Sequence, residues 1–369
     1  MSHTPRVVIV IVSWNALPLL KSCLPSVMAT DYPDFEVVLA DNASTDGSAA
    51  WVRQRFPRVH VVTHAENWAF ARGNNEAVRD ARVQALQADY YVFLNNDVEV
   101  PSDWLRPLVA RMESEPDLVA VQPKLLRHDD RGAFEYAGAA GGFMDALGYP
   151  FTRGRVLFTM ERDEGQYDDA RHAFWATGAA LMIRRQAWDV SGGFDEEFVM
   201  HMEEIDLCWR LQHRRSHADL HVGSEPAART WRVGVEPGSR VFHIGGASLP
   251  QGSPDKTFLN FRNNLLMLYK NLPPGRFGPG PFYRILVLRT PLDMLAAGRA
   301  ALGGRWQEAL AIPRAYWAAH RLKSRYSAAR PAAGSAAPLP WRGTLAWHYI
   351  LRGRRTFTRL EQARPLEVR

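Results

Sequence analysis

Residues Val7–Asn15 read VVIVIVSWN, a run of six β-branched residues that stops at a polar tripeptide. Two later stretches repeat this pattern. Phe35–Ala40 is followed by Asp41 and Asn42, and Tyr90–Leu94 is followed by Asn95, Asn96 and Asp97. Apolar runs this short and continuous are typical of strands buried on both faces, as in parallel sheets. These runs therefore predict the central strands of an α/β sheet.

The segments between these strands have helical character. Apolar residues recur at helical spacing in Leu17–Met28, and helices are also expected over Ala49–Phe56 and Asn74–Leu86, with a further strand at Val59–Thr63. Alternating strands and helices indicate a mostly parallel sheet flanked by helices, with its ligand crevice at the carboxyl ends of the strands. We therefore expect the polar residues that follow the three strands to meet at one edge.

Composition excludes several protein classes. Of 369 residues, 46% are hydrophobic and 23% charged, which rules out a wholly disordered or collagen-like chain. No apolar run reaches the roughly 18 residues that span a bilayer, and no signal peptide is recognised, so a cytoplasmic protein is expected. Two cysteines, Cys23 and Cys208, cannot supply a disulfide framework or a four-thiolate metal site.

Charge divides the chain in two. Residues 273–369 carry 17 Lys and Arg against 4 Asp and Glu, a net charge of +13, whereas residues 1–272 carry −7. Together with the prolines between 273 and 281, this predicts a main domain over 1–272 and a basic, mainly helical extension over 273–369. The extension either binds an anionic partner or is a solvated helical surface. Residues Ala328–Pro340 are low in complexity and are expected to form a linker.

Four groups of residues have types suited to chemistry, although each also has a purely structural interpretation. Asp41 can accept a hydrogen bond from a base, or can belong to a turn. Asn96 and Asp97 suit a hard divalent cation that also binds substrate phosphates, or form a turn. Glu203, Glu204 and Asp206 begin a predicted helix, where one could act as a general base or all could favour the helix dipole. His243 ends another apolar run and is either a ligand or a structural histidine.

Seven segments in order resemble glycosyltransferase family 2, specifically its bacterial rhamnosyltransferase-like branch with a GT-A fold. They cover roughly residues 5–270 and read VVIVIVSWN, EVVLADNASTDGS, ENWAFARGNNEA, YYVFLNNDVEV, TGAALMIRR, GGFDEEFVMHMEEIDLCWR and VFHIGGAS. The resemblance implies transfer of one sugar from a nucleotide-sugar donor, with inversion at the anomeric carbon.

The resemblance also implies roles for individual residues. The donor-binding positions are Ser13, Asp41, Asn67, Arg72 and Asn96. Asp97 and His243 match the metal-binding positions, for Mg²⁺ or Mn²⁺, and Glu204 matches the general base, with Glu203 as its neighbour. The sequence departs from the family pattern in three places: Asn95 stands at the first acidic position, a glutamate stands where the base is often aspartate, and Ala69 and Ala77 replace frequent glycines.

The resulting expectation is an inverting, metal-dependent enzyme that uses a dTDP- or UDP-sugar and a cell-envelope glycan or lipid-linked acceptor. The alternatives are a nucleotidyltransferase and a non-catalytic glycan-binding relative. For the extension, Phe282–Tyr326 mixes apolar, aromatic and basic residues, as interfacial helices do. Attachment to the inner face of an anionic membrane is the expected role. Homo-oligomer contact is the alternative, and nucleic acid is the least favoured partner.

Overall fold

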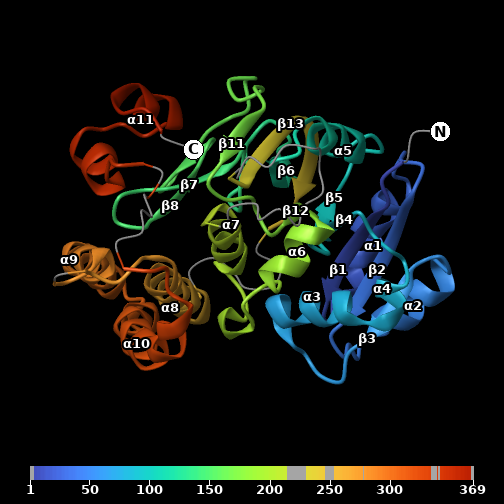
Figure 1. The fold of residues 1–369 in the computed structure, drawn as a ribbon, viewed down its shortest axis with the longest axis horizontal. Coiled ribbons are helices and arrows are strands. Elements are labelled where there is room, and N and C mark those ends of the chain that lie inside the picture. The colour runs from blue at the N-terminus through green and yellow to red at the C-terminus, as the bar shows by residue number, and fades with distance from the viewer. Residues whose placement is uncertain are drawn as a thin grey trace.

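The computed structural model describes residues 4–213, 230–245, 253–276, 278–333, 339 and 341–366. Within them, nine strands form one sheet of order β11-β13-β6-β12-β4-β1-β2-β3, with β5 paired to β13 (Figure 1). The strands run as follows: β1 Val7–Ser13, β2 Phe35–Asp41, β3 His60–Thr63, β4 Tyr90–Leu94, β5 Val98–Glu99, β6 Leu118–Arg127, β11 Arg171–Ala173, β12 Ala180–Arg184 and β13 Arg232–His243.

The first half of the sheet has the predicted parallel arrangement. Strand β1 pairs in parallel with both β2 and β4, and β2 pairs in parallel with β3. Alternate side chains of β1 enter different cores: Val8 and Val10 pack with residues of α3 and α7, whereas Ile9 and Ile11 pack with residues of α1 and α5. Burial on both faces explains why this strand is continuously apolar.

The helices around this half are α1 Leu17–Met28, α2 Ser48–Arg55, α3 Ala69–Arg79, α4 Ala81–Gln84 and α5 Leu105–Ser114. One prediction is corrected here, because the single helix expected over Asn74–Leu86 is two helices. The backbone leaves the helical region at Asp80, and its carboxylate accepts a hydrogen bond of 2.9 Å from the Arg82 amide. Asp80 therefore caps a new helix, and α3 begins earlier than predicted.

The second half of the sheet makes it mixed. Strand β12 pairs antiparallel with both β4 and β6, whereas β13 runs parallel to β6. A separate small sheet of order β10-β9-β8-β7 lies beside it, with β7 Gly142–Met144, β8 Pro150–Thr152, β9 Arg155–Val156 and β10 Thr159–Met160. Two helices, α6 Arg185–Ser191 and α7 Glu203–His213, and the short turn η1 Glu196–Phe198 follow β12.

Most of the remaining chain is helical: α8 Pro254–Asn271, α9 Pro281–Leu302, α10 Trp306–Leu322, η2 Lys323–Ala329, η3 Ala346–Leu351 and α11 Phe357–Ala363. The break at 273–281 lies between α8 and α9, as predicted. Residues 334–338 and 340 of the predicted linker lie outside the described residues. Helices α8 to α10 gather at one side of the molecule (Figure 1). No helix in the described ranges combines the length and the apolar character needed to cross a bilayer.

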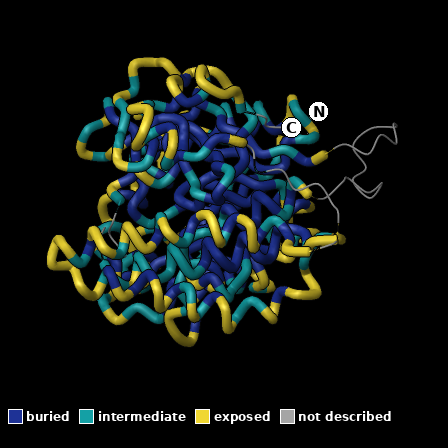
Figure 2. The backbone as a smooth tube through the Cα atoms, turned by 90° about the vertical axis from the view of Figure 1, so that its left-hand side faces the viewer, coloured by how far each residue is buried: buried dark blue, intermediate teal, exposed yellow. Residues whose placement is uncertain are grey.

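The basic extension shares buried cores with the rest of the chain. Trp341 and Phe357 are fully buried in a cluster that also contains Phe143 and Phe151 of the small sheet. The Trp341 ring centroid lies 5.4 Å from that of Phe151, and its indole donates a 3.0 Å hydrogen bond to the Arg364 carbonyl. In Figure 2 this buried interior continues through the molecule beneath an exposed outer layer. The end of the extension therefore packs against the small sheet and shares a buried core with it.

A pair of tryptophans tests this packing. Trp341→Ala should lower the free energy of unfolding by about 3–5 kcal/mol, because it opens a cavity in a fully buried cluster. Trp347→Ala, at a half-exposed position of the same segment, should change it by less than about 0.5 kcal/mol. Chemical denaturation of both variants gives the comparison. Equal losses of stability would show that the extension is not part of a common core.

Candidate functional site

The carboxyl ends of β1 and β2 bring Ser13 and Asp41 together. The two residues are partners in the parallel register, and the Asn42 amide donates a 2.8 Å hydrogen bond to the Ser13 carbonyl. Asp41 is buried. Its Oδ2 accepts a 3.3 Å hydrogen bond from the Ser44 amide, whereas its Oδ1 is enclosed without a hydrogen-bond partner among the described residues. An unpartnered buried carboxylate oxygen is a ready acceptor for a ligand donor.

The end of β4 adds Asn96 to this pair. Its Nδ2 lies 3.2 Å from the Ser13 Oγ, to which it donates. Ser13, Asp41 and Asn96 therefore follow three neighbouring strands and lie at one edge of the sheet, as the strand pattern predicted.

Asn67 precedes α3 and is linked to this edge through Asn42, whereas Arg72 lies in the first turn of α3, near Glu66 and Glu196. Asn67 is exposed, and its Oδ1 accepts hydrogen bonds from the Ala69 amide at 2.9 Å and from Asn42 Nδ2 at 3.3 Å. The Arg72 guanidinium lies 4.3 Å from the Trp68 ring centroid and is 45% exposed, so it can reach a ligand. Ala69 has a φ of 54°, a backbone conformation that glycine adopts without steric cost and other residues adopt rarely.

A histidine lies between two carboxylates beside the β4 turn. His243 Nε2 is 3.1 Å from Asp97 Oδ1, and His243 Nδ1 is 3.2 Å from Glu135 Oε2. All three side chains are buried. Burial alone would lower the pKa of His243, but Asp97 and Glu135 together raise it to about 10. In the absence of a competing cation, the imidazole is therefore held in its charged form.

The Asp97 and His243 atoms fit a divalent cation that also binds a substrate. Adjacent ligands of an octahedral ion lie about 3 Å apart, close to the separation of Asp97 Oδ1 and His243 Nε2. The described ranges contain no group of three or more His, Cys, Asp or Glu side chains that could hold a metal. A cation at this pair would therefore need further ligands from the phosphates of a bound nucleotide.

Three acidic residues at the start of α7 have different environments. Asp206 is fully buried and ion-paired to Arg210 at 2.7 Å and to Lys270 at 2.8 Å. Glu203 is buried and Glu204 half-buried, and the Oε2 atom of each is enclosed without a hydrogen-bond partner among the described residues. The structure thus separates the three carboxylates by their partners. Asp206 is ion-paired to Arg210 and Lys270, whereas Glu203 and Glu204 each keep an Oε2 atom without a hydrogen-bond partner among the described residues.

These environments shift the pKa values of Glu203 and Glu204 upwards and that of Asp206 downwards. Burial raises the pKa of Glu204 to about 7. Burial and the nearby Glu204 charge raise the pKa of Glu203 well above its usual range. Burial would also raise the pKa of Asp206, but Lys270 and Arg210 lower it overall. Near neutral pH, Glu204 can therefore both accept and release a proton, as a general base must.

Glu204 lies close to the segment that contacts both the β4 turn and α3. A Cβ built on Gly178 would lie 3.5 Å from the Cβ of Glu204 and 3.5 Å from the Phe70 ring of α3. The neighbouring Ala179 carbonyl accepts a 3.0 Å hydrogen bond from the Asn95 amide. Glu204 is thus linked through one short segment to the turn that carries Asn96 and Asp97.

The loop before α7 is strained and firmly held. Val199, His201 and Met202 all have positive φ, between 64° and 73°. The Asn263 amide of α8 donates to the carbonyls of Phe198, Met200 and His201 at 2.8–2.9 Å. Strained backbone of this kind persists only where the surroundings fix it. Here the strain and the clamp together set the position of Glu203 and Glu204.

Sequence reasoning gave no individual role to Asn42, Glu135 or Asn263, although it placed Asn42 among the residues expected at the sheet edge. Asn42 stands in a recognised segment, and its link to Asn67 depends on the folded loop. Glu135 and Asn263 lie in segments where no motif was recognised, so no local signal indicated their contacts. Their importance comes from long-range neighbours, which only the structure shows.

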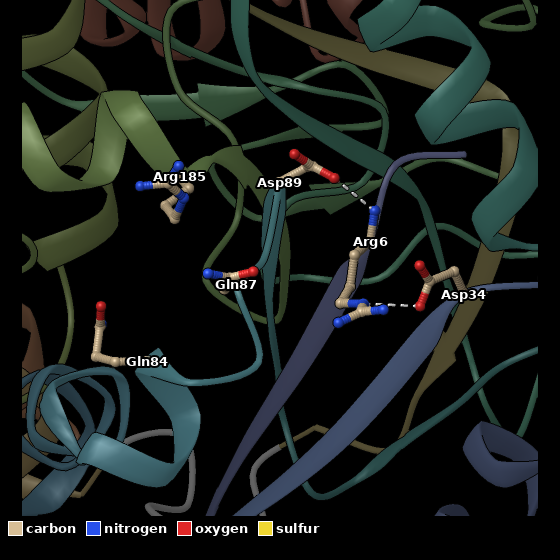
Figure 3. A pocket seen from close by; sticks show the side chains of 6 residues that line it. All are labelled: Arg6, Asp34, Gln84, Gln87, Asp89 and Arg185. Carbon is tan, nitrogen blue, oxygen red and sulfur yellow. Dashed lines mark hydrogen bonds and ion pairs between the residues drawn. The ribbon is translucent and has the colours of Figure 1, made fainter. Parts of the chain in front are cut away.

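A separate hollow lies away from these residues. A space of about 550 Å³ is lined by Arg6, Asp34, Gln84, Gln87, Asp89 and Arg185 (Figure 3). Arg6 pairs with Asp34 at 2.9 Å, and its amide donates to Asp89 at 2.7 Å. These residues precede β1, β2 and β4, so the hollow opens at the amino ends of the strands, opposite the candidate site.

The free energy of unfolding tests whether Asp206 is ion-paired and Glu204 is unpaired. Asp206→Asn should lower the free energy of unfolding by about 3 kcal/mol, because it leaves two buried cations without their carboxylate. The stabilisation from Asp206 is fully present above its unfolded-chain pKa of about 3.9 and is lost as the pH falls towards its lower folded-state pKa. Glu204→Gln, at an unpaired carboxyl, should not reduce stability. Denaturation at pH 7 and at about pH 3 compares the two variants with the native protein, and the loss caused by Asp206→Asn should be smaller at the lower pH. A larger loss in Glu204→Gln would contradict these assignments.

Comparison with known proteins places this geometry in a family. The model described as glycosyl transferase family 2 matches residues 8–188. An N-acetylglucosaminyl-diphospho-decaprenol L-rhamnosyltransferase of Mycobacterium tuberculosis is 31% identical over 215 residues, covering 55% of this chain and 69% of the relative. The rhamnosyltransferase WbbL of Escherichia coli is 25% identical over 207 residues, covering 56% and 76%.

A solved structure agrees with the fold. A mannosyltransferase of Pyrobaculum calidifontis, in complex with GDP-Man and Mn²⁺, superposes with a TM-score of 0.50 at 18% sequence identity. The match covers 99% of this chain and 82% of that one. The family match, the rhamnosyltransferase relatives and the GT-A architecture agree with one another. The chain belongs to glycosyltransferase family 2 and is a glycosyltransferase similar to bacterial rhamnosyltransferases.

Proposed function

We propose that this glycosyltransferase moves a single sugar, rhamnose or a hexose, from a dTDP- or UDP-sugar to a cell-envelope glycan or its lipid-linked precursor. The transfer inverts the anomeric carbon and uses Mg²⁺ or Mn²⁺. Two relatives support the sugar and acceptor class: the mycobacterial one is named for rhamnosyl transfer to a diphospho-decaprenol, and that of Escherichia coli for rhamnosyl transfer. The mannosyltransferase with the similar fold was solved with a nucleotide sugar and Mn²⁺.

The observation that carries the mechanism is the enclosed, unpaired carboxyl of Glu204. Its pKa of about 7 makes it a base that can take a proton from an acceptor hydroxyl near neutral pH. The hydroxyl oxygen then bonds to the anomeric carbon as the bond to the nucleoside diphosphate breaks. Because attack and departure occur on opposite faces, the configuration inverts, and no covalent enzyme intermediate is needed.

The donor lies, in this proposal, across the ends of β1, β2 and β4. Asp41 Oδ1 accepts a hydrogen bond from the N–H of a pyrimidine ring, and Ser13 and Asn96 line the adjoining edge. Asn67 and Arg72 approach from the other side of this edge, where the Arg72 cation offsets charge on the departing diphosphate. A divalent cation held by Asp97 and His243 would supply further charge compensation for that diphosphate.

The two alternative functions have less support. A nucleotidyltransferase would normally carry a glycine-rich basic loop after its first strand, and Val7–Asn15 contains no glycine. A glycan-binding relative without activity would be expected to have lost Asp97 or the acidic cluster at Glu203 and Glu204, and both remain.

The general-base assignment makes a kinetic prediction. Glu204→Gln should reduce kcat by about 100-fold or more, because the isosteric amide cannot accept the acceptor proton. Donor affinity should be unchanged in isothermal titration, since the substitution is remote from the nucleotide contacts. Glu164→Gln, at an exposed position, is the matched control. Near-normal turnover in Glu204→Gln would exclude this residue as the base.

The pH profile sharpens this test. In the native enzyme, kcat/KM should rise with pH and level off above about 7, because the base works only when deprotonated. Glu204→Gln should lose that rising limb. An unchanged limb in the variant would assign the titrating group to another residue.

Metal dependence makes a separate prediction, tested by donor hydrolysis with dTDP- and UDP-sugars. Chelation should abolish hydrolysis, and Mg²⁺ or Mn²⁺ should restore it. Asp97→Asn should raise the metal concentration needed for half-maximal activity by about tenfold or more, because it removes the only carboxylate assigned to the cation. Asp103→Asn provides a control at an exposed aspartate near the same turn. Full activity in chelator would contradict the proposed cation.

A further inference from the structure

The C-terminal part of the chain exposes large apolar side chains that a packed core would normally cover. Leu302 is 93% exposed and Trp306 65%, on either side of the turn between α9 and α10. Ile350 and Leu351 at the end of η3 are similarly exposed, at 65% and 67%, and Phe158 of the small-sheet region is 77% exposed. Single exposed apolar residues are ordinary, but a connected group of this size indicates an interaction site.

Ring contacts connect these residues into one surface. Phe158 lies 6.2 Å from Tyr349, which immediately precedes Ile350. The Arg299 guanidinium lies 5.3 Å from the Phe158 ring, and Arg299 is one helical turn before Leu302 on α9. We call this surface, formed by Phe158, Arg299, Leu302, Trp306, Ile350 and Leu351, the apolar–basic face. The C-terminal elements that contribute to it lie on the side that Figure 2 views directly.

Cations accompany the apolar side chains throughout this surface. Arg355 lies 5.8 Å from the Tyr349 ring, and Arg352 lies 5.1 Å from the Trp347 ring beside it. The extension as a whole has a net charge of +13. Arginine and tryptophan at the boundary of an aliphatic surface match the layering of a bilayer, in which anionic headgroups cover acyl chains.

Two other occupants fit these features less well. A second copy joined through a twofold interface would bring two faces of the same strong positive charge together, which disfavours the contact. Single-stranded nucleic acid would use aromatic rings for stacking, whereas Leu302, Ile350 and Leu351 are aliphatic. We propose that the apolar–basic face docks on an anionic lipid surface. This inference does not depend on the proposed sugar transfer.

The face is attached rigidly to the rest of the protein. Arg289 of α9 is buried, pairs with Asp293 at 3.0 Å, and reaches the Leu147 carbonyl at 3.3 Å. The hydroxyls of Tyr149 and Tyr316 also donate to Asp293, each at 2.5 Å. Since this network and the buried Trp341 cluster fix the extension, docking would hold the whole enzyme in one orientation on the lipid.

Vesicle co-sedimentation of the full chain tests the proposal. The probes are vesicles of phosphatidylcholine alone and of equal parts phosphatidylcholine and phosphatidylglycerol. The native protein should bind the mixed vesicles at least tenfold more tightly, and added salt should weaken this binding. The combined variant Leu302→Ser, Trp306→Ser and Leu351→Ser should bind them about tenfold or more weakly, because it removes the inserted side chains.

Controls separate docking from other effects. Val190→Ser, at an exposed apolar position on α6, should bind like the native protein. Arg299→Gln with Arg355→Gln keeps the apolar side chains and should selectively reduce binding to the anionic vesicles. Unfolding curves confirm that each variant is folded. Native-like binding by the combined variant, or no preference for anionic vesicles, would overturn the proposal. A dimer that the combined variant abolishes, without vesicle binding by the native chain, would overturn it in favour of a second copy.

Discussion

The ion pair between Asp97 and His243 connects the parts on which the candidate site depends. Asp97 follows the end of β4, whereas His243 ends β13, far along the chain, and Glu135 supports the imidazole from its other side. The adjoining backbone joins them further, because the Ile244 amide donates a 3.0 Å hydrogen bond to the Asp97 carbonyl. These contacts hold the end of β13 beside the turn that follows β4, so that Asp97 and His243 lie next to each other.

A second constraint positions the acidic side of the site. The loop before α7 keeps three residues at positive φ, and Asn263 of α8 satisfies three of its carbonyls. Asp206 then fastens the first turn of α7 to Lys270 of the same α8. Helix α8 thus holds both the loop before α7 and the first turn of α7, and it leaves Glu204 without a hydrogen-bond partner among the described residues. Because Asp206 is ion-paired and Glu204 is not, the pKa of Asp206 is lowered whereas that of Glu204 is raised.

Much of the fold could be predicted from local sequence. The strands that end at Ser13, Asp41 and Leu94 were predicted from short apolar runs, because burial on both faces leaves a clear pattern. The division at Asp80 was missed, since a single aspartate can end one helix and cap the next. The antiparallel β12 was not foreseen either, because an apolar run carries no information about the direction of its partner.

The candidate site could be predicted only in part, because some of its contacts join segments that are far apart in the sequence. Residues within recognised segments, such as Asp41 and Glu204, could be proposed from the sequence, whereas Glu135 and Asn263 matter through contacts with distant segments. The resemblance matched Glu204 to the general base, but the residues alone could not show which of Glu203, Glu204 and Asp206 is paired, since tertiary neighbours decide it.

The central claim is that these separated residues form one cleft around an activated sugar donor. The most direct measurement is a crystal structure of the full chain with dTDP or UDP and Mn²⁺. The account predicts the base against Asp41, the diphosphate beside Arg72, and Mn²⁺ bound between Asp97 and His243, with the Glu204 carboxyl facing the site from the opposite side. A nucleotide bound at the hollow near Arg6, or Mn²⁺ coordinated away from Asp97 and His243, would contradict it.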